Sequence, residues 1–326
     1  MITRIMTYIR KHPIRFFTAK LLLLIVVIVL LDFSLGSLFR YLYFHQKKGE
    51  LYRITYAMEQ SNEDLIVYGS SRADHHYHPE IFKKRLQLSF FNTGLEGEHI
   101  FFQYALLKGT LKRFTPKVVI LDFTAGEFKK DRESYDRISN LLPYYDNHPE
   151  IRSILELRGP YEKYKLLSKL YPYNSEFIQV ARNVMATRQT KEDDTEGYFP
   201  LYGTTHDPRV HIRFPEAYPT DTNKIKAYTA FITDCRKAGA ELFIICSPYY
   251  QDAENEEYSI VLGKQIAKKY GVDFLDFSHN TLFSNTADYF SDPGHLNDTG
   301  ARLFSDLVID SISKSVNAQQ IKLALR

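Results

Sequence analysis

The stretch Asp64-Leu-Ile-Val-Tyr-Gly-Ser-Ser-Arg72 decides the fold of this chain. Residues 65–68 are a short apolar run with β-branched side chains, bounded by charge before and by glycine after, which is typical of a buried strand. Gly69 permits the sharp turn that follows, so the two serines and Arg72 are expected at the carboxyl edge of the sheet, where open α/β folds build their sites. A serine there is either a nucleophile or only the cap of the next helix.

A second polar motif, Asp292-Pro-Gly-His295, lies near the carboxyl end of the chain and runs into an amphipathic helix. A serine hydroxyl is a poor nucleophile at neutral pH, and it needs a base within hydrogen-bond reach whose tautomer a carboxylate fixes. One loop therefore supplies both the base, His295, and the orienting carboxylate, Asp292. We expect Ser71 to be the nucleophile that faces them.

Strand and helix patterns alternate through most of the chain. Apolar strands are predicted at 65–68, 88–92, 117–123, 241–247 and 272–277, with helices at 79–85, 100–113, 221–238, 254–270 and 297–313. Such alternation predicts a mostly parallel sheet covered by helices on both faces. The expected fold class is therefore α/β, a three-layer α/β/α flavodoxin-like domain with about five strands.

Together, Gly-Ser-Ser at 69–71 and Asp-x-x-His at 292–295 resemble the nucleophile and acid–base blocks of the SGNH/GDSL hydrolase superfamily. The resemblance implies the same three-layer domain and serine acyl-ester chemistry, with no metal or cofactor. By resemblance to the family's second block, Gly97 joins the amide of Ser71 as an oxyanion donor. The residues around Gly97 are equally explained by a tight strand-to-helix turn that requires glycine.

The third block departs from the family pattern. SGNH enzymes carry Gly-x-Asn-Asp there, and the asparagine donates to the oxyanion, whereas this chain has Leu121-Asp-Phe-Thr-Ala-Gly-Glu127. Thr124 is a candidate donor in its place, and Asp122 is a candidate for shaping the site. Arg72 either binds an anionic group of the substrate or braces the loop. In this respect the chain resembles the membrane-anchored branches of the superfamily, in which the third block is often degenerate. These branches include DltD-type proteins and the SGNH-like proteins of polysaccharide O-acetylation.

An apolar stretch over residues 16–39 is long enough to cross a bilayer, which takes about 20 residues, although Lys20 and Asp32 interrupt it. More basic residues precede its apolar core than follow it, so the positive-inside rule predicts a cytoplasmic amino terminus and an extracytoplasmic body. A cleaved signal peptide is the alternative, but no clear small-x-small site follows the apolar core. Asp32 either marks the outer interface, which we prefer, or meets a partner membrane protein.

The strand–helix pattern breaks off over residues 129–220, which is too long for a plain connection and predicts a mainly helical lid or subdomain. Its tyrosines either stack on sugar faces or pack between helices. His206, Asp207 and His211 form a cluster there that we expect on the surface or the lid. The predicted order is a basic leader (1–15), an anchor (16–39), a helical stalk (40–62), an SGNH-like domain (63–313) with this insertion, and a tail (314–326).

The composition, with 44% hydrophobic and 25% charged residues among 326, is that of an ordinary globular chain with one substantial core. The net charge of +3 divides into +7 over residues 1–48 and −4 over the rest. The body is therefore not basic, and nucleic-acid binding lacks the cationic face that it needs. Cys235 and Cys246 are predicted to be buried thiols.

These features predict a single-pass cell-membrane protein with an extracytoplasmic serine esterase or acyltransferase domain. The predicted membrane location and the resemblance suggest that the substrate is an acyl group, chiefly acetyl, on a cell-surface glycan. A small acyl ester is the other substrate class that fits. An integral-membrane acyltransferase is the partner class that fits. The alternative is a catalytically silent glycan-binding or assembly protein that uses the same cleft with a membrane partner. Hydrolysis and transfer would use the same residues.

Overall fold

The structure is a computed structural model that describes residues 13–185 and 196–314. Its centre is a five-stranded parallel sheet with the order β2-β1-β3-β5-β7. The strands are β1 (Leu65–Tyr68), β2 (Phe90–Asn92), β3 (Val118–Asp122), β5 (Glu241–Cys246) and β7 (Asp273–Asp276). The α/β class and the five-stranded parallel sheet are therefore confirmed, and each strand lies within its predicted range.

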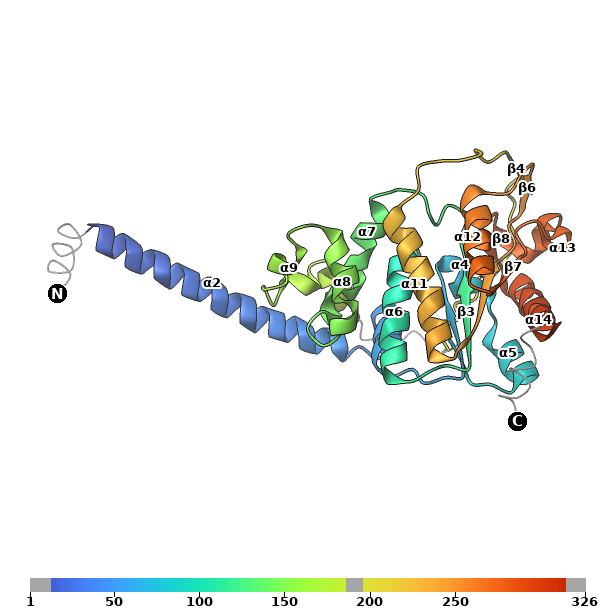
Figure 1. The fold of residues 1–326 in the computed structure, drawn as a ribbon. Helices are drawn as coiled ribbons and strands as arrows, with labels where there is room; N and C mark the ends of the chain where they lie inside the picture. The colour runs from blue at the N-terminus through green and yellow to red at the C-terminus, as the bar shows by residue number, and fades with distance from the viewer. Residues whose placement is uncertain (1–12, 186–195, 315–326) are drawn as a thin grey trace.

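Helices lie on both faces of the sheet (Figure 1), because successive residues of a strand point to opposite sides. In β1, Ile66 and Tyr68 belong to one hydrophobic core and Leu65 and Val67 to the other. The first core includes residues of α3 (Gly49–Glu59), α6 (Ile100–Arg113), α11 (Thr222–Ala238) and α12 (Tyr258–Lys269). The second includes residues of α4 (Ser71–His76), α5 (Pro79–Leu86) and α14 (Asp298–Lys314).

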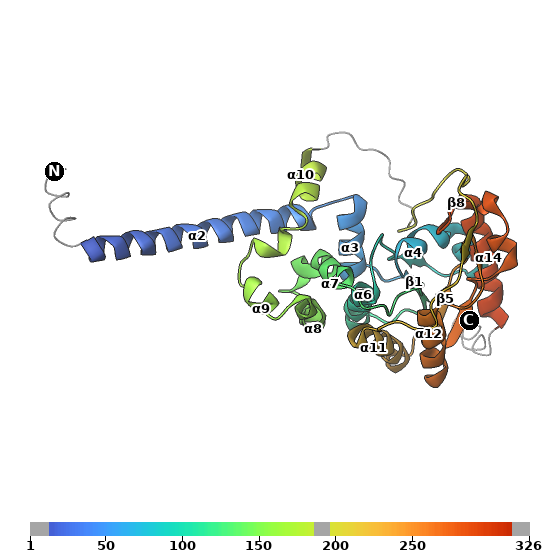
Figure 2. The same ribbon diagram turned by 90° about the horizontal axis from the view of Figure 1, so that it is seen from above.

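One helix of the described residues, α2 (Pro13–Phe44), is long and apolar enough to cross a membrane, and it projects from the body in Figures 1 and 2. The apolar side chains from Leu21 to Leu31 are exposed, whereas Gly36, Phe39 and Tyr43 in the last third are buried against the body. The helix extends beyond the predicted span of 16–39 at both ends. The rest of the predicted stalk contains α3, which packs into the main core.

An isolated antiparallel bridge joins Lys129 to Thr220, so the two ends of the predicted insertion meet. Between them lie α7 (Glu133–Arg137), η1 (Ile138–Tyr144), η2 (Pro149–Ile151), α8 (Arg152–Leu155), η3 (Glu156–Arg158), α9 (Glu162–Lys165), η4 (Tyr171–Tyr173), α10 (Phe177–Met185) and β4 (Val210–Ile212). Helices α9 and α10 lie beside α2 rather than beside α4 (Figure 2). This helical part is therefore a subdomain that packs against α2, and it is not a lid over Ser71.

Two small sheets complete the fold. Strand β4 pairs in parallel with β6 (Gln251–Ala253), and β8 (Phe290–Asp292) pairs with β9 (His295–Leu296) in an antiparallel hairpin. The turn predicted at 292–295 is therefore the turn of a hairpin, and it is followed by α14. Between β7 and the hairpin lie α13 (Thr281–Ser284) and η5 (Ala287–Tyr289).

The remaining side chains singled out in the sequence lie in the core or on the surface. His206 and Asp207 are exposed, and His211 is paired with Asp252 across the β4–β6 sheet, as expected of surface residues. Cys235 and Cys246 are buried free thiols. Most of the basic leader and nearly all of the tail lie outside the described residues.

Candidate active site

Ser71 is the first residue of α4, just beyond the carboxyl end of β1. A Cβ at Gly69 would lie 2.5 Å from the Cβ of Ala73 and 2.9 Å from that of Asp122. The φ of Gly69 is not in the left-handed region, although the sequence suggested that this position needs the backbone freedom of glycine. Glycine is required here because a side chain would clash with Ala73 and Asp122. The tight contact sets the start of α4 directly on the edge of the sheet.

Neither of the two serines caps α4 with its hydroxyl. Ser70 is the N-cap residue, yet its side chain makes no capping hydrogen bond and its Oγ lies 3.1 Å from Oγ1 of Thr124. The Ser71 Oγ lies 2.8 Å from Nε2 of His295. The geometry therefore disfavours the capping role that was the simpler explanation of this stretch.

Ser71, His295 and Asp292 form one hydrogen-bonded chain. Nδ1 of His295 lies 2.9 Å from both carboxylate oxygens of Asp292. Because a carboxylate only accepts, Nδ1 carries the ring proton and Nε2 accepts from the Ser71 hydroxyl. The structure thus brings together the three residues that the sequence proposed, although Ser71 and His295 are 224 positions apart.

The hairpin turn holds Asp292 in this position. Its Oδ1 also accepts hydrogen bonds from the amides of Gly294 at 2.8 Å and His295 at 3.1 Å. These bonds close the four-residue turn on the carboxylate, which explains why base and carboxylate can come from one short motif. The orientation of His295 is therefore set by its own loop.

Burial is the main influence on the pKa of His295, and it lowers this pKa below the ordinary value. The hydrogen bond and charge of Asp292 act in the opposite direction, while His75 and Arg72 add to the lowering. A lowered pKa keeps the imidazole neutral near physiological pH, which is the state that a general base requires.

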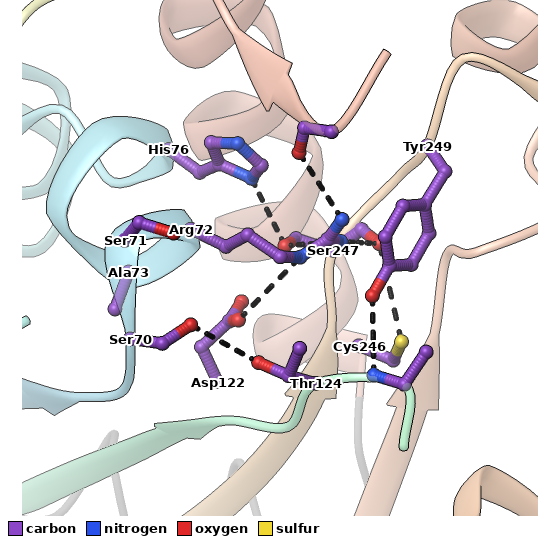
Figure 3. Close-up of polar contacts among 12 residues, drawn as sticks. Ser70, Ser71, Arg72, Ala73, His76, Asp122, Thr124, Cys246, Ser247 and Tyr249 are labelled. Atoms are coloured by element: carbon purple, nitrogen blue, oxygen red, sulfur yellow. Dashed lines mark hydrogen bonds and ion pairs between the residues drawn. The ribbon is translucent and has the colours of Figure 1, made fainter. Parts of the chain in front are cut away.

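Arg72 is buried, with 3% of its surface exposed, and it joins the start of α4 to two loops (Figure 3). Its guanidinium donates to the carbonyl and hydroxyl oxygens of Ser247, and to the carbonyls of Pro248 at 3.2 Å and Gly294 at 3.3 Å. It also lies over the ring of Tyr249, 3.4 Å from the centroid. Of the two roles considered for Arg72, the geometry supports the brace and not the contact with a substrate anion.

Asp122 is the last residue of β3 and lies beneath the start of α4. It accepts from the hydroxyl of Tyr77 at 2.6 Å and lies 4.0 Å from Nε of Arg72. Burial raises the pKa of Asp122 to about 6. Thr124, which follows this strand, bonds Ser70 and is not among the described residues that line the cavity around Ser71, so its role as a substitute donor stays a prediction.

Two histidines that the sequence analysis missed follow Ser71 by about one helical turn. Nε2 of His76 accepts from the amide of Leu296 at 2.9 Å, so its Nδ1 is protonated and donates to Oγ of Ser247 at 2.9 Å. Burial lowers the pKa of His76, which stays neutral and ties α4 to the hairpin. The ring of His75 lies 5.5 Å from that of His295. The His-His pair directly after the nucleophile stretch was the signal that could have found them.

A cavity of about 630 Å³ includes Ser71, Asp292 and His295 in its wall. One side comes from residues 47–53, the segment that follows α2, and another from residues 197–201 at the end of the insertion. Its aromatic side chains include Tyr52, Phe91 and Phe199. The sequence therefore missed that the predicted stalk forms part of the wall.

Arg53 of α3 connects the wall formed by residues 47–53 to the rest of the site through hydrogen bonds. Its Nη2 donates to the carboxylate of Asp74 at 2.7 Å and to the carbonyls of Gly94 at 2.6 Å and Gly197 at 2.7 Å. One side chain thus joins α4, the turn after β2 and the end of the insertion. No motif marks such a residue, since its partners are distant in sequence.

The expected oxyanion donors are the amide of Ser71 and Gly97. Ser71 begins α4, and the first amides of a helix have no intrahelical acceptor, so its amide remains the expected donor. Gly97 has a φ of 74°, and a Cβ there would lie 2.6 Å from the guanidinium of Arg137. Among the described residues that line the cavity are Leu95 and Glu96 but not Gly97, whose donor role stays a prediction.

No protein-family model matches this chain, and no curated protein matches it either. Among the described residues, no three or more His, Cys, Asp and Glu side chains are grouped to hold a metal ion. Any functional conclusion therefore starts from the geometry around Ser71.

Proposed function

We propose that this chain is a membrane-anchored SGNH-type serine acyl-ester hydrolase or acyltransferase that acts on acyl groups, chiefly acetyl, of cell-surface glycans. The observation that carries the proposal is the hydrogen-bonded chain from Ser71 through His295 to Asp292 in a cavity wall. The parallel sheet with helices on both faces supports the three-layer arrangement of that superfamily. A site at the carboxyl edge of β1 is where such sheets bind ligands.

In the first half of the reaction, Ser71 Oγ attacks the acyl carbonyl carbon while Nε2 of His295 takes the hydroxyl proton. Asp292 stabilises the imidazolium, and the amide of Ser71, with Gly97 by resemblance, stabilises the oxyanion. The bond to the departing alcohol breaks as His295 returns the proton to its oxygen. Water or a sugar hydroxyl then gives its proton to His295 and attacks the carbonyl carbon of the acyl-serine ester. The bond from this carbon to Ser71 Oγ breaks as His295 returns the proton to Oγ.

The glycan substrate is supported by the walls of the cavity. Tyr52 and Phe199 offer aromatic faces, and rings of this kind stack on sugars. The wall at Lys47 begins three residues after α2 ends at Phe44, so the cavity lies close to the anchor. The excess of basic residues before the apolar core supports a cytoplasmic amino terminus and an extracytoplasmic body. A membrane-embedded acyltransferase is the partner class that would deliver acyl groups to such a site.

A fluorophosphonate probe tests the proposal, because it reacts with an activated serine. The full-length protein should be labelled on Ser71, as mapped by peptide mass spectrometry, and Ser71→Ala should not be labelled. Ser70→Ala is the matched control and should be labelled like the wild type. If the wild type is not labelled but still binds surface oligosaccharides, the chain is instead a silent glycan-binding or assembly protein.

The pH dependence gives a second test. Only neutral His295 accepts the proton of Ser71, so kcat/KM for a small acetyl ester should rise with pH as His295 loses its proton. Because burial lowers the pKa of His295, the midpoint of this rise should lie below 6.5. The measurement is a pH profile of kcat/KM for the full chain in detergent. A midpoint above 6.5 would contradict the assignment, and His75→Gln should move the midpoint upward.

A further inference from the structure

We propose that the insertion rests on the lipid bilayer through a surface formed by Tyr161, Tyr164 and Leu167, termed here the insertion foot. These side chains are 70%, 67% and 77% exposed. They lie at and around α9, the part of the insertion that lies beside α2 in Figures 1 and 2. This second contact with the membrane is independent of the chemistry proposed for Ser71.

Contacts between the insertion and α2 fix the level of the foot along the anchor. The carboxylate of Asp32 accepts from the hydroxyl of Ser168, and from the amides of Lys169 at 2.8 Å and Leu170 at 3.3 Å. A Cβ at Gly36 would lie 2.4 Å from the carbonyl carbon of Lys169, so the two backbones touch. Leu167 is the residue before this contact, so the foot lies near the level of Asp32. These bonds also give Asp32 a partner within its own chain.

The level of Asp32 coincides with the expected boundary of the bilayer. Residues 13–31 of α2 measure roughly 28 Å at about 1.5 Å per residue, close to the ~30 Å of a hydrocarbon core. With this register the foot lies in the headgroup region.

The chemistry of the foot suits a membrane interface and not bulk water. Tyrosine rings concentrate where apolar chains meet headgroups. Exposed Lys163 provides an ammonium group for lipid phosphates, whereas the ammonium of Lys165 pairs with Glu162 at 3.1 Å. The acid of this segment, Glu162, is 1% exposed and bonded to Arg158 and Tyr171, so it does not present its charge to lipid. Exposed aromatic and aliphatic side chains beside a basic residue therefore indicate that the insertion foot contacts a lipid bilayer.

Tryptophan fluorescence offers a direct test, because the chain contains no tryptophan. The full chain carrying Tyr164→Trp would be placed, one copy per disc, in lipid nanodiscs with phospholipids brominated near the headgroup or near the chain ends. We expect blue-shifted emission that headgroup-proximal bromines quench most strongly. Leu167→Trp gives a second position and should behave in the same way.

Two matched variants calibrate the measurement. Leu24→Trp, in the exposed apolar part of α2, should be quenched most strongly by bromines near the chain ends. Leu282→Trp on α13, 47% exposed and far from α2 in Figure 1, should not be quenched. Emission of the foot variants that matches Leu282→Trp would overturn the proposal. A blue shift that requires two copies per disc would also overturn it, and would assign the foot to a second copy of this chain.

Discussion

Ser71→Ala and His295→Ala should each lower kcat/KM for a small acetyl ester by roughly a thousandfold or more. Ser71→Ala removes the nucleophile, and His295→Ala removes the base that lies 2.8 Å from it. Initial rates of acetate release by the full-length protein in detergent provide the measurement. Because nucleophile and base act as one unit, the double variant should be no slower than either single variant.

Ser70→Ala is the matched control for this loss. The Ser70 hydroxyl is next to the nucleophile in sequence but bonds Thr124 and not His295. Its removal should change kcat/KM by less than about tenfold, since a single neutral hydrogen bond contributes only about 0.5–1.5 kcal/mol. If Ser71→Ala keeps most of the activity, or Ser70→Ala loses as much, then Ser71 is not the nucleophile.

Arg72→Ala should lower the free energy of unfolding by about 3–5 kcal/mol, the usual loss when one member of a buried charged pair is removed. The Arg72 side chain is 4% exposed, and its loss leaves Asp122 and the oxygens of Ser247 without their cation. Arg72→Lys should recover only part of the loss, since an ammonium lacks the guanidinium fork. Thermal unfolding of the full chain in detergent would measure the effect.

Arg85→Ala is the matched control, because it removes an arginine that is exposed and not buried. Its side chain is 38% exposed and pairs with Asp306 and Asp310 on α14, and exposed pairs of this kind contribute at most about 1 kcal/mol. An Arg72→Ala protein that is as stable as Arg85→Ala, but that loses affinity for anionic substrates, would contradict the bracing role. It would restore the alternative in which Arg72 binds a substrate anion.

The sequence alone predicted the elements whose signals are local. Strand β1 follows from four consecutive buried apolar residues, and α6 was placed at its observed bounds of Ile100 and Arg113. The pairing of Asp292 with His295 was also predictable, because both residues lie in one short turn. Burial of apolar side chains and turn geometry act over a few neighbouring residues, so they leave a pattern that can be read directly.

Apart from the pairing of Ser71 with His295, which the resemblance of their two motifs predicted, tertiary structure alone decided the contacts between distant segments. Nothing in the sequence near Arg53 indicates that it joins Asp74 to Gly197. Nor does the sequence indicate that Asp32 binds the insertion, which was expected to be either a lid or a subdomain. The same holds for Arg72, whose two possible roles were separated only by its burial beside Ser247. These polar contacts depend on how the two cores and α2 pack. The sequence pattern around a polar side chain does not indicate which distant residue it will contact. The local pattern thus determined the strands, helices and hairpin pair, whereas packing decided which side chains surround Ser71.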